Sequence, residues 1–389
     1  MSETLKGNWN YPTSVRFGAG RIAELPEACR SLGMKRPLLV TDRGLAGAQI
    51  TRDTLALLAA DGLPAGIFSE VRPNPAGADV EAGVVAYRAG GHDGVIAFGG
   101  GSGIDAAKAV ALMVGQDRPI WDFEDRDDWF TRVRTEAMAP VVAVPTTSGT
   151  GSEVGRASVI TDARDHTKKI IFHPRMLPAI VIADPALTLA LPAHITAAVG
   201  MDALSHNLEA YCSPFYHPLA QGIALEGMRL IHENLPLAYH RGDDLAARAQ
   251  MMAASAMGAT AFQKGLGAMH AMSHPVGALF DTHHGLTNAV VMPYVLVFNR
   301  AAIEQKLTAL ARYLDLPAPS FRAVLEWVLD LRNEIGIPRT LADLGVGEAD
   351  VPRLAPMAAR DPSCGGNPVT LDEEILAALY RKAIAGDLE

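Results

Sequence analysis

The stretch KGLGAMHAMSHPVGALFDTHHG (Lys264–Gly285) is rich in histidine and gives the strongest indication of how the rest of the chain is organised. It contains four of the twelve histidines in the protein. His270 and His274 are four residues apart in a run rich in Ala, Met and Gly, so on a helix they share one face. The segment therefore predicts a helix that presents imidazole groups from one side.

A second pair of ligand-type side chains, Asp202 and His206, has the same spacing in the sequence MDALSH. Two helices that each offer such a pair can close on a divalent cation. One pair alone is most often an acid beside a core histidine, but two pairs followed by the doublet His283-His284 favour a metal site. Five of these candidates are histidines, and not all five can be ligands, so at least one histidine lies beside the metal or is catalytic. Three imidazoles and one carboxylate leave a site of net charge about +1 around a divalent ion, with open positions for a substrate oxygen.

Composition places the chain among ordinary globular proteins. With 389 residues, 49% of them hydrophobic and 20% charged, it is long enough for two or more domains. A formal net charge of −9 argues against a nucleic-acid or anionic-membrane surface. We find no uncharged apolar run of about 18 residues that predicts a membrane span, and no basic, apolar leader that predicts export. The three cysteines, Cys29, Cys212 and Cys364, are far apart, which fits a reducing cytoplasm and leaves nitrogen and oxygen as metal ligands.

The first half of the chain alternates between strand-like and helix-like segments. Short apolar runs bounded by turn residues predict strands at 37–42, 65–71, 95–98, 140–145 and 179–185. Helical periodicity is present at 45–62, at 76–89 and after the glycine-rich turn at 99–105. Such alternation predicts a largely parallel sheet with helices on both faces, whose ligands bind at the carboxyl ends of the strands.

The pattern changes near Leu189–Pro192, where strand signals end. We therefore predict two domains, 1–192 and 193–389, the first α/β and the second all-helical. The helices expected in the second domain are 197–211, 218–234, 244–264, 267–279, 301–314 and 320–334.

The turn GGGSGID (Gly99–Asp105) lies between a strand and a helix. Its glycines allow backbone N–H groups to approach a phosphate, and the following helix N-terminus favours an anion; a plain tight turn is the alternative. A Rossmann fingerprint is a weaker interpretation, because a strand–helix–strand unit already precedes this turn. The acid that ends the earlier strand, Asp42, is placed to accept hydrogen bonds from a ribose diol, which favours NAD over NADP; a helix-capping or turn role is the alternative.

A second polar turn, PTTSGTGSE (Pro145–Glu153), follows a buried strand. Hydroxyls of Thr146, Thr147 and Ser148 could bond a pyrophosphate or a nicotinamide amide, although a hydroxyl-rich loop is often only a solvated turn.

Together GGGSGID, PTTSGTGSE, GMDALSH and the histidine-rich stretch, in this order, resemble the iron-dependent (group III) alcohol dehydrogenases. The resemblance implies an α/β dinucleotide-binding domain, an all-helical metal domain and an active site in the cleft between them. It implies metal ligation by Asp202, His206, His270 and His284, the last because the family ligand directly precedes Gly, and it places His274 off the metal, near nicotinamide and substrate. The implied cofactor contacts are Asp42, Asn74, Gly100, Gly101, Ser102, Asp105, Thr146, Thr147, Thr150 and Lys168.

The resemblance implies reversible hydride transfer between a primary alcohol and NAD, with Fe²⁺ as the expected metal and Zn²⁺ as the alternative. Similarity of FQKGLG and HHGLTNAVVMP to 4-hydroxybutyrate-type members makes that ω-hydroxy acid a candidate substrate, and Arg156 could meet its carboxylate. Lactaldehyde, simple aldehydes and maleylacetate are further substrates that the residues leave open. The rival functions are a dehydroquinate-synthase-like lyase and a non-catalytic metal- or nucleotide-binding protein. A cytoplasmic homodimer or larger homo-oligomer is the family expectation.

Overall fold

The computed structural model describes residues 11, 13–165 and 167–389. They form two compact units. The first, here called the sheet unit, comprises Pro12–Thr147 and Gly151–Ala190. The second, the helical unit, comprises Leu191–Glu389 together with the short segment Ser148–Thr150.

The sheet unit is built on six parallel strands, in the spatial order β1-β8-β5-β4-β2-β3. The strands are β1 (Ser14–Phe17), β2 (Leu38–Asp42), β3 (Gly66–Val71), β4 (Val95–Gly99), β5 (Val141–Pro145) and β8 (Ile180–Ala183). All residues of β4, β5 and β8 are buried, as expected for inner strands covered on both faces. The predicted parallel sheet is confirmed.

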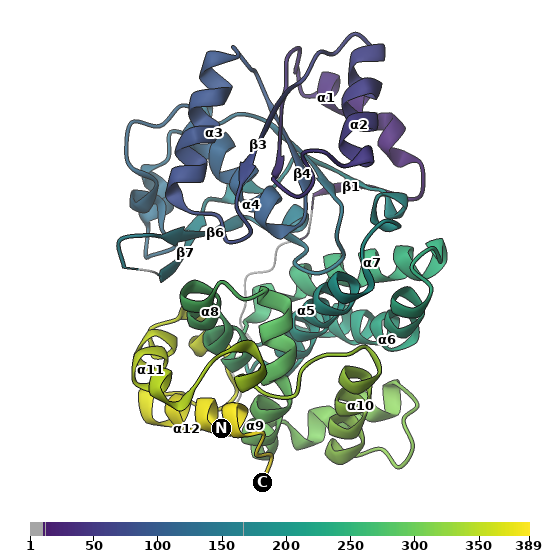
Figure 1. Cartoon of the computed structure of the whole chain (residues 1–389), viewed down its shortest axis with the longest axis vertical. Helices are drawn as coiled ribbons and strands as arrows, with labels where there is room; N and C mark the ends of the chain where they lie inside the picture. The colour runs from purple at the N-terminus through teal and green to yellow at the C-terminus, as the bar shows by residue number, and fades with distance from the viewer. Residues whose placement is uncertain (1–10, 12, 166) are drawn as a thin grey trace. The chain divides into compact units, whose positions relative to one another are not determined.

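Helices cover both faces of this sheet (Figure 1). Leu25 of α1 (Leu25–Ser31) and Leu58 of α2 (Gln49–Ala60) pack in one apolar cluster with β2, β4 and β5. On the opposite face, α3 (Gly77–Ala89) and α4 (Gly101–Met113) form a second cluster. Since β4 ends at Gly99 and α4 begins at Gly101, Gly100 alone separates the strand from the helix.

Two features of the sheet unit have no counterpart in the sequence interpretation. Strand β1 lies at a sheet edge, and its partly exposed sequence SVRF lacks the apolar run by which the inner strands were recognised. An antiparallel hairpin, β6 (Ala157–Asp162) with β7 (Thr167–Phe172), forms a separate two-stranded sheet after the loop that follows β5.

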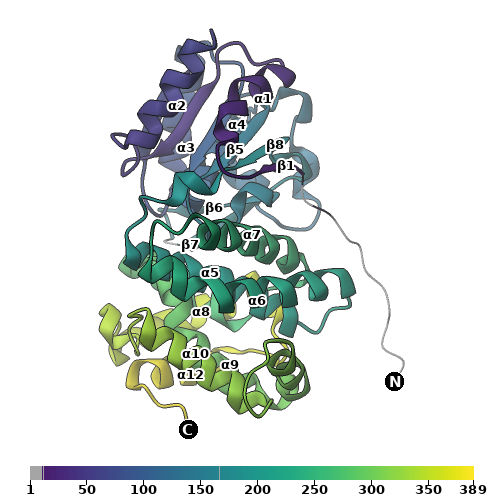
Figure 2. The ribbon, with the colours of Figure 1, turned by 90° about the vertical axis from the view of Figure 1, so that its right-hand side faces the viewer.

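The helical unit contains eight helices among its described residues. They are α5 (Ala193–Cys212), α6 (Pro218–His240), α7 (Leu245–Ala261), α8 (Ala268–Phe280), α9 (His284–Tyr313), α10 (Phe321–Glu334), α11 (Val351–Ala359) and α12 (Glu373–Ala385). Figure 2 shows α5, α6 and α7 as neighbouring long helices, and one apolar cluster joins residues of α5 to α12. The all-helical character of this part of the chain agrees with the prediction.

Helix α9 is much longer than the sequence suggested, because it starts at His284 rather than near Ala301. Residues 289–296 are all buried, so this part of the helix has no polar face and no periodicity to reveal it. By length and composition α9 could cross a membrane, but 67% of its most apolar window is buried inside the structure, as in the core helix of a globular domain.

Candidate metal centre and nucleotide-binding turn

Four potential metal ligands from three helices converge in the helical unit. Asp202 and His206 project from α5, His270 from α8 and His284 from the start of α9, with one ligand atom of each lying within 4.8 Å of all the others. Three of them are almost fully buried, and His284 is partly exposed. The rings of His206 and His270 stack with 4.8 Å between their centroids. Four such donor atoms at this spacing can hold one cation.

Gly285 allows α9 to begin this close to α5. A Cβ atom at Gly285 would lie 2.4 Å from the carbonyl oxygen of Ala198 and 2.7 Å from Cβ of Asp202. Any larger residue at this position would therefore clash with α5 unless the start of α9 shifted. The pairing of His284 with the following glycine thus has a steric reason.

The chemistry of the donor set fits Fe²⁺ or Zn²⁺. Burial lowers the pKa of His206 to about 4, against the opposing effect of Asp202, so its ring is neutral at physiological pH as a ligand must be. Three imidazoles and one carboxylate are ligands that both metals accept. Cysteine is absent from the group.

The structure separates the remaining histidines from these four. His283 is the N-cap of α9, and its Nδ1 accepts a hydrogen bond from the backbone N–H of Leu286. His274 lies one turn beyond His270, and its ring stacks on that of His284 with 5.3 Å between centroids. Nδ1 of His274 is 2.7 Å from Oδ2 of Asp361. His274 is thus adjacent to the ligand group without being part of it.

In the sheet unit, several predicted cofactor residues follow the carboxyl ends of the neighbouring strands β5, β4 and β2, whereas Asn74 follows β3 and Lys168 lies in β7. A Cβ atom at Gly100 would lie 3.1 Å from Oγ1 of Thr147, and one at Gly103 would lie 3.2 Å from the Phe98 carbonyl oxygen. Gly99 has φ = 142°, which a residue with a side chain rarely adopts. Gly100 is the N-cap of α4 and offers no side chain of its own, so the helix N-terminus can receive an anion.

Several of these residues also hold the protein together. Oδ1 of Asp42 accepts from the backbone N–H of Leu45, which is the turn role that the sequence left open. The hydroxyl of Ser102 donates to the Pro73 carbonyl oxygen at 3.3 Å, and Nζ of Lys168 donates to Oδ1 of Asn74 at 2.9 Å. Two other predicted contacts are placed differently. Oγ1 of Thr146 is buried without a hydrogen-bond partner among the described residues. Thr150 lies in the three-residue segment that belongs to the helical unit.

The side chain of Asp105, a predicted cofactor contact, has its hydrogen-bond partners within the protein. Its carboxylate bonds to the hydroxyl of Ser152, accepts from the backbone N–H of Val159 at 2.9 Å and lies 3.3 Å from Nζ of Lys108. The side chain therefore anchors the polar loop after β5 to α4, and direct contact with a cofactor stays a prediction.

Three residues that contact the ligand group or His274 were missed by the sequence interpretation. Glu209 and Asn288 touch the ligand group from α5 and α9, and both had a detectable signal: Glu209 follows His206 by three residues, and Asn288 follows His284 by four. Nδ2 of Asn288 lies 2.9 Å from Oδ1 of Asp202 and 3.1 Å from Nε2 of His284. Asp361 is 87 residues beyond His274, and no spacing rule connects them.

The helical unit contains a buried cluster of nitrogen and oxygen ligands, and the sheet unit has a glycine turn at the carboxyl end of β4. These features are typical of an enzyme that binds a metal and a nucleotide. Family models identify the class: residues 12–185 match iron-containing alcohol dehydrogenase, and residues 196–384 match the C-terminal domain of the same family. The chain belongs to the iron-containing alcohol dehydrogenase family, and the predicted enzyme class is confirmed.

Individual relatives match over almost their whole length. The chain is 38% identical to the 4-hydroxybutyrate dehydrogenase of Cupriavidus necator, over 96% of this chain and 98% of the relative. It is 37% identical to the 1,3-propanediol dehydrogenase of Klebsiella pneumoniae, over 98% and 99%. It is 33% identical to the NAD-dependent methanol dehydrogenase of Bacillus methanolicus, over 97% and 100%. Among solved structures, a 1,3-propanediol oxidoreductase superposes with a TM-score of 0.91 at 36% identity, covering 97% of this chain and 99% of the other.

Proposed function

We propose that this protein is an NAD(H)- and Fe²⁺-dependent dehydrogenase that interconverts a short primary alcohol and its aldehyde. The observation that carries the proposal is the convergence of donor atoms from Asp202, His206, His270 and His284 within 4.8 Å. Zn²⁺ suits the same ligands and is the alternative metal.

A divalent cation held by these side chains supplies a Lewis acid for the substrate oxygen, and NAD supplies the hydride acceptor. The chain itself holds the ligands in place and moves the proton. His274 accepts or donates that proton in the proposal, because Asp361 occupies its Nδ1 and leaves Nε2 for exchange with the substrate side.

The cofactor proposal rests on the carboxyl ends of β2, β4 and β5. Backbone N–H groups of Gly100, Gly101 and Ser102 begin α4 and would bond the pyrophosphate. Asp42 would bond the adenosine ribose and disfavour a 2′-phosphate. The remaining proposed contacts are Asn74, Asp105, Thr146, Thr147, Thr150 and Lys168.

Among substrates, we propose a short ω-hydroxy acid such as 4-hydroxybutyrate, the substrate named for a relative of high identity. Arg156 is the proposed partner for its carboxylate. The guanidinium lies 5.5 Å from the centre of the Phe172 ring, which would orient it without neutralising its charge. Substitution of Arg156 by Gln should raise KM for 4-hydroxybutyrate about tenfold, because a tenfold change in affinity corresponds to the free energy of about one hydrogen bond to a charged group. KM for 1,3-propanediol, which has no carboxylate, should stay unchanged.

The rival lyase activity of the dehydroquinate-synthase type needs several cations for a phosphate and a carboxylate. Lys264 is the one Lys or Arg between Arg248 and Arg300. Its Nζ is buried and donates to the carbonyl oxygens of Ala210, Tyr211 and Ser213. With this ammonium group bonded to the end of α5, residues 249–299 have no other Lys or Arg to bind a substrate phosphate, which the rival reaction needs.

The decisive experiment follows NADH absorbance at 340 nm with protein that has been stripped by a chelator and then reloaded. The substrates are succinic semialdehyde, 3-hydroxypropanal, lactaldehyde and maleylacetate. We expect oxidation of NADH after addition of Fe²⁺, weaker activity with Zn²⁺ and none without metal. Turnover that persists after exhaustive chelation would exclude the proposed activity. So would the absence of NADH oxidation with all four substrates.

We further propose that residues 1–192 and 193–389 are the two domains, that the enzyme works in the cytoplasm on small molecules, and that it assembles as a homodimer or larger homo-oligomer. A nucleic-acid or membrane partner does not fit the net charge of −9.

A further inference from the structure

Glu209 lies on α5, three residues after His206, and its carboxylate is buried against the first turn of α8. Its two oxygens have different partners. Oε2 is 2.6 Å from Nδ1 of His270, and Oε1 accepts from the backbone N–H of Met269 at 2.7 Å. One carboxylate therefore forms hydrogen bonds with both the ring of His270 and the backbone of the preceding residue.

This arrangement determines which nitrogen of His270 can bind a metal. An ionised carboxylate only accepts hydrogen bonds, so Nδ1 of His270 must carry the proton. Nε2 is then left with its lone pair. That atom lies 3.3 Å from Nδ2 of Asn288, which also bonds Asp202 and His284, so the lone pair faces the other ligands.

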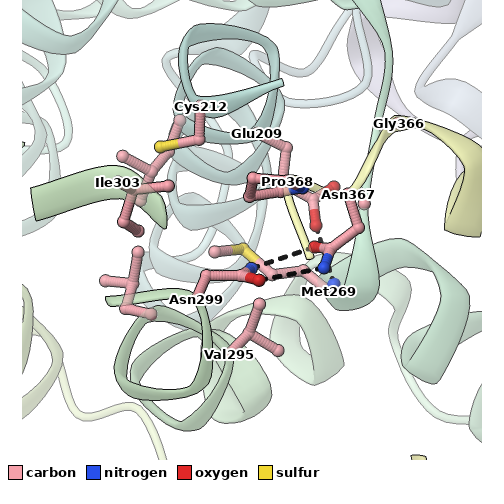
Figure 3. A pocket seen from close by; sticks show the side chains of 12 residues that line it. Glu209, Cys212, Met269, Val295, Asn299, Ile303, Gly366, Asn367 and Pro368 are labelled. Carbon is pink, nitrogen blue, oxygen red and sulfur yellow. Dashed lines mark hydrogen bonds between the residues drawn. The ribbon is translucent and has the colours of Figure 1, made fainter. Parts of the chain in front are cut away.

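The start of α8 has a second polar support that does not touch the metal ligands. Oδ1 of Asn367 accepts from the backbone N–H of Ala268 at 3.2 Å, and Asn367 exchanges two side-chain hydrogen bonds with Asn299 (Figure 3). A Cβ atom at Gly267 would lie 2.9 Å from Asn367 and 3.0 Å from Glu209. Both side chains thus support the same helix terminus at close range, and Glu209 alone of the two reaches His270.

We propose that Glu209 is a positioning residue of the metal centre: it fixes the tautomer and the ring orientation of His270. The proposal rests on the metal site of the proposed function, but not on any particular substrate. Partners of this kind on a ligating histidine typically contribute about 10- to 100-fold to metal affinity.

The test compares Glu209→Gln and Glu209→Ala with the control Asn367→Ala. The two donors, Nδ1 of His270 and the N–H of Met269, are bonded by different oxygens of Glu209. Glutamine replaces one of these oxygens by an NH2 group, which donates, so one of the two donors loses its acceptor. The affinity for Zn²⁺ and Co²⁺ is measured by competition with a chelator, and the d–d absorption of Co²⁺ reports the ligand geometry. Circular dichroism and thermal unfolding of the stripped protein show whether each variant is folded.

We expect the glutamine variant to bind Co²⁺ about tenfold more weakly than the unmodified chain, with an altered absorption spectrum, and the alanine variant to lose up to about 100-fold. The control should unfold at a lower temperature and yet keep the metal affinity and the spectrum. Equal affinity in the Glu209 variants and the unmodified chain, an equal loss in Asn367→Ala, or failure of both Glu209 variants to fold would overturn the proposal. Tight metal binding without NADH oxidation in the unmodified chain would instead reject the proposed function and leave this inference standing.

Discussion

Nδ1 of His274 lies 2.7 Å from Oδ2 of Asp361, which joins the middle of α8 to the loop after α11. Burial alone would raise the pKa of Asp361, but the charge and hydrogen bond of His274, with the bonds of Ser363, outweigh it and hold the pKa below its usual value. The carboxylate therefore stays ionised and accepts a hydrogen bond from Nδ1 of His274, whose ring lies beside that of His284 in the ligand group.

This relationship predicts separate effects for the two partners on turnover. His274→Ala should lower kcat by about 10²-fold or more and flatten the pH–rate profile, because the proton carrier is lost. Asp361→Asn should lower kcat by a smaller factor at unchanged KM, since an amide can donate to Nδ1 and select the other tautomer. Steady-state kinetics from pH 6 to 10 checks both. Asp372→Asn, which alters the N-cap of α12, is the control; unchanged turnover in His274→Ala would remove the residue from the mechanism.

Asn288 supplies a test of the ligand group that needs no substrate. In Asn288→Asp a second carboxylate would lie against Asp202, where the amide now donates at 2.9 Å. Without metal the two buried charges repel, and with metal the added charge is attracted. The stripped variant should therefore melt several degrees lower than the unmodified chain and gain more from added Zn²⁺. The control is Asn207→Asp. Asn207 is buried like Asn288, but it lies on α5 and its amide donates to carbonyl oxygens. This variant should also melt at a lower temperature, but added Zn²⁺ should stabilise it no more than it stabilises the unmodified chain.

The negative charge of Asp42 is expected to determine the preference of the enzyme for NAD over NADP. Asp42→Asn keeps an oxygen for the Leu45 N–H and removes the negative charge. KM for NAD should rise about tenfold, since a charged hydrogen bond to the ribose is weakened, and KM for NADP should fall. Competition kinetics with both cofactors measures the ratio. A variant that melts normally and keeps its preference for NAD would limit Asp42 to its turn role.

The inner sheet was predictable because its strands are apolar runs flanked by turn residues, whereas β1 and the hairpin of β6 and β7 were not. Their residues are partly exposed, and the hairpin owes its position to Asp105 and Lys108, which bind backbone groups of residues 152–159. No periodicity encodes such a contact. The sequence also could not show where α9 begins, because residues 289–296 are all buried and give this part of the helix no polar face.

The candidate metal site was largely predictable for the opposite reason. Ligands one helical turn apart mark a helix face directly, and Asp202 with His206 and His270 with His274 both had this spacing. Spacing could not separate ligand from neighbour, however. The structure shows the difference: the donor atoms that converge belong to Asp202, His206, His270 and His284. His274 lies beside them with Nδ1 bonded to Asp361, and His283 caps α9.

Glu153 in the loop after β5 makes stability depend on pH. Burial raises the pKa of Glu153 to about 7, although its own backbone N–H and the Lys108 ammonium favour the ionised form. A raised pKa means that the stabilisation is complete below the unfolded value near 4.5 and is lost as the pH rises through about 7. A tenfold change in proton affinity corresponds to about 1.4 kcal/mol, so the stability lost between pH 5 and pH 8 is on the order of 3 kcal/mol.

Glu153→Gln should remove this loss, because the amide resembles the protonated acid. The variant should melt close to the unmodified chain at pH 5 and several degrees above it at pH 8, as measured by thermal unfolding of stripped protein at both pH values. Glu136→Gln, at a side chain that is 77% exposed, is the matched control and should show no difference at either pH. A constant gap between Glu153→Gln and the unmodified chain across this range would mean that the buried carboxyl group does not titrate there, and that Lys108 holds it ionised throughout.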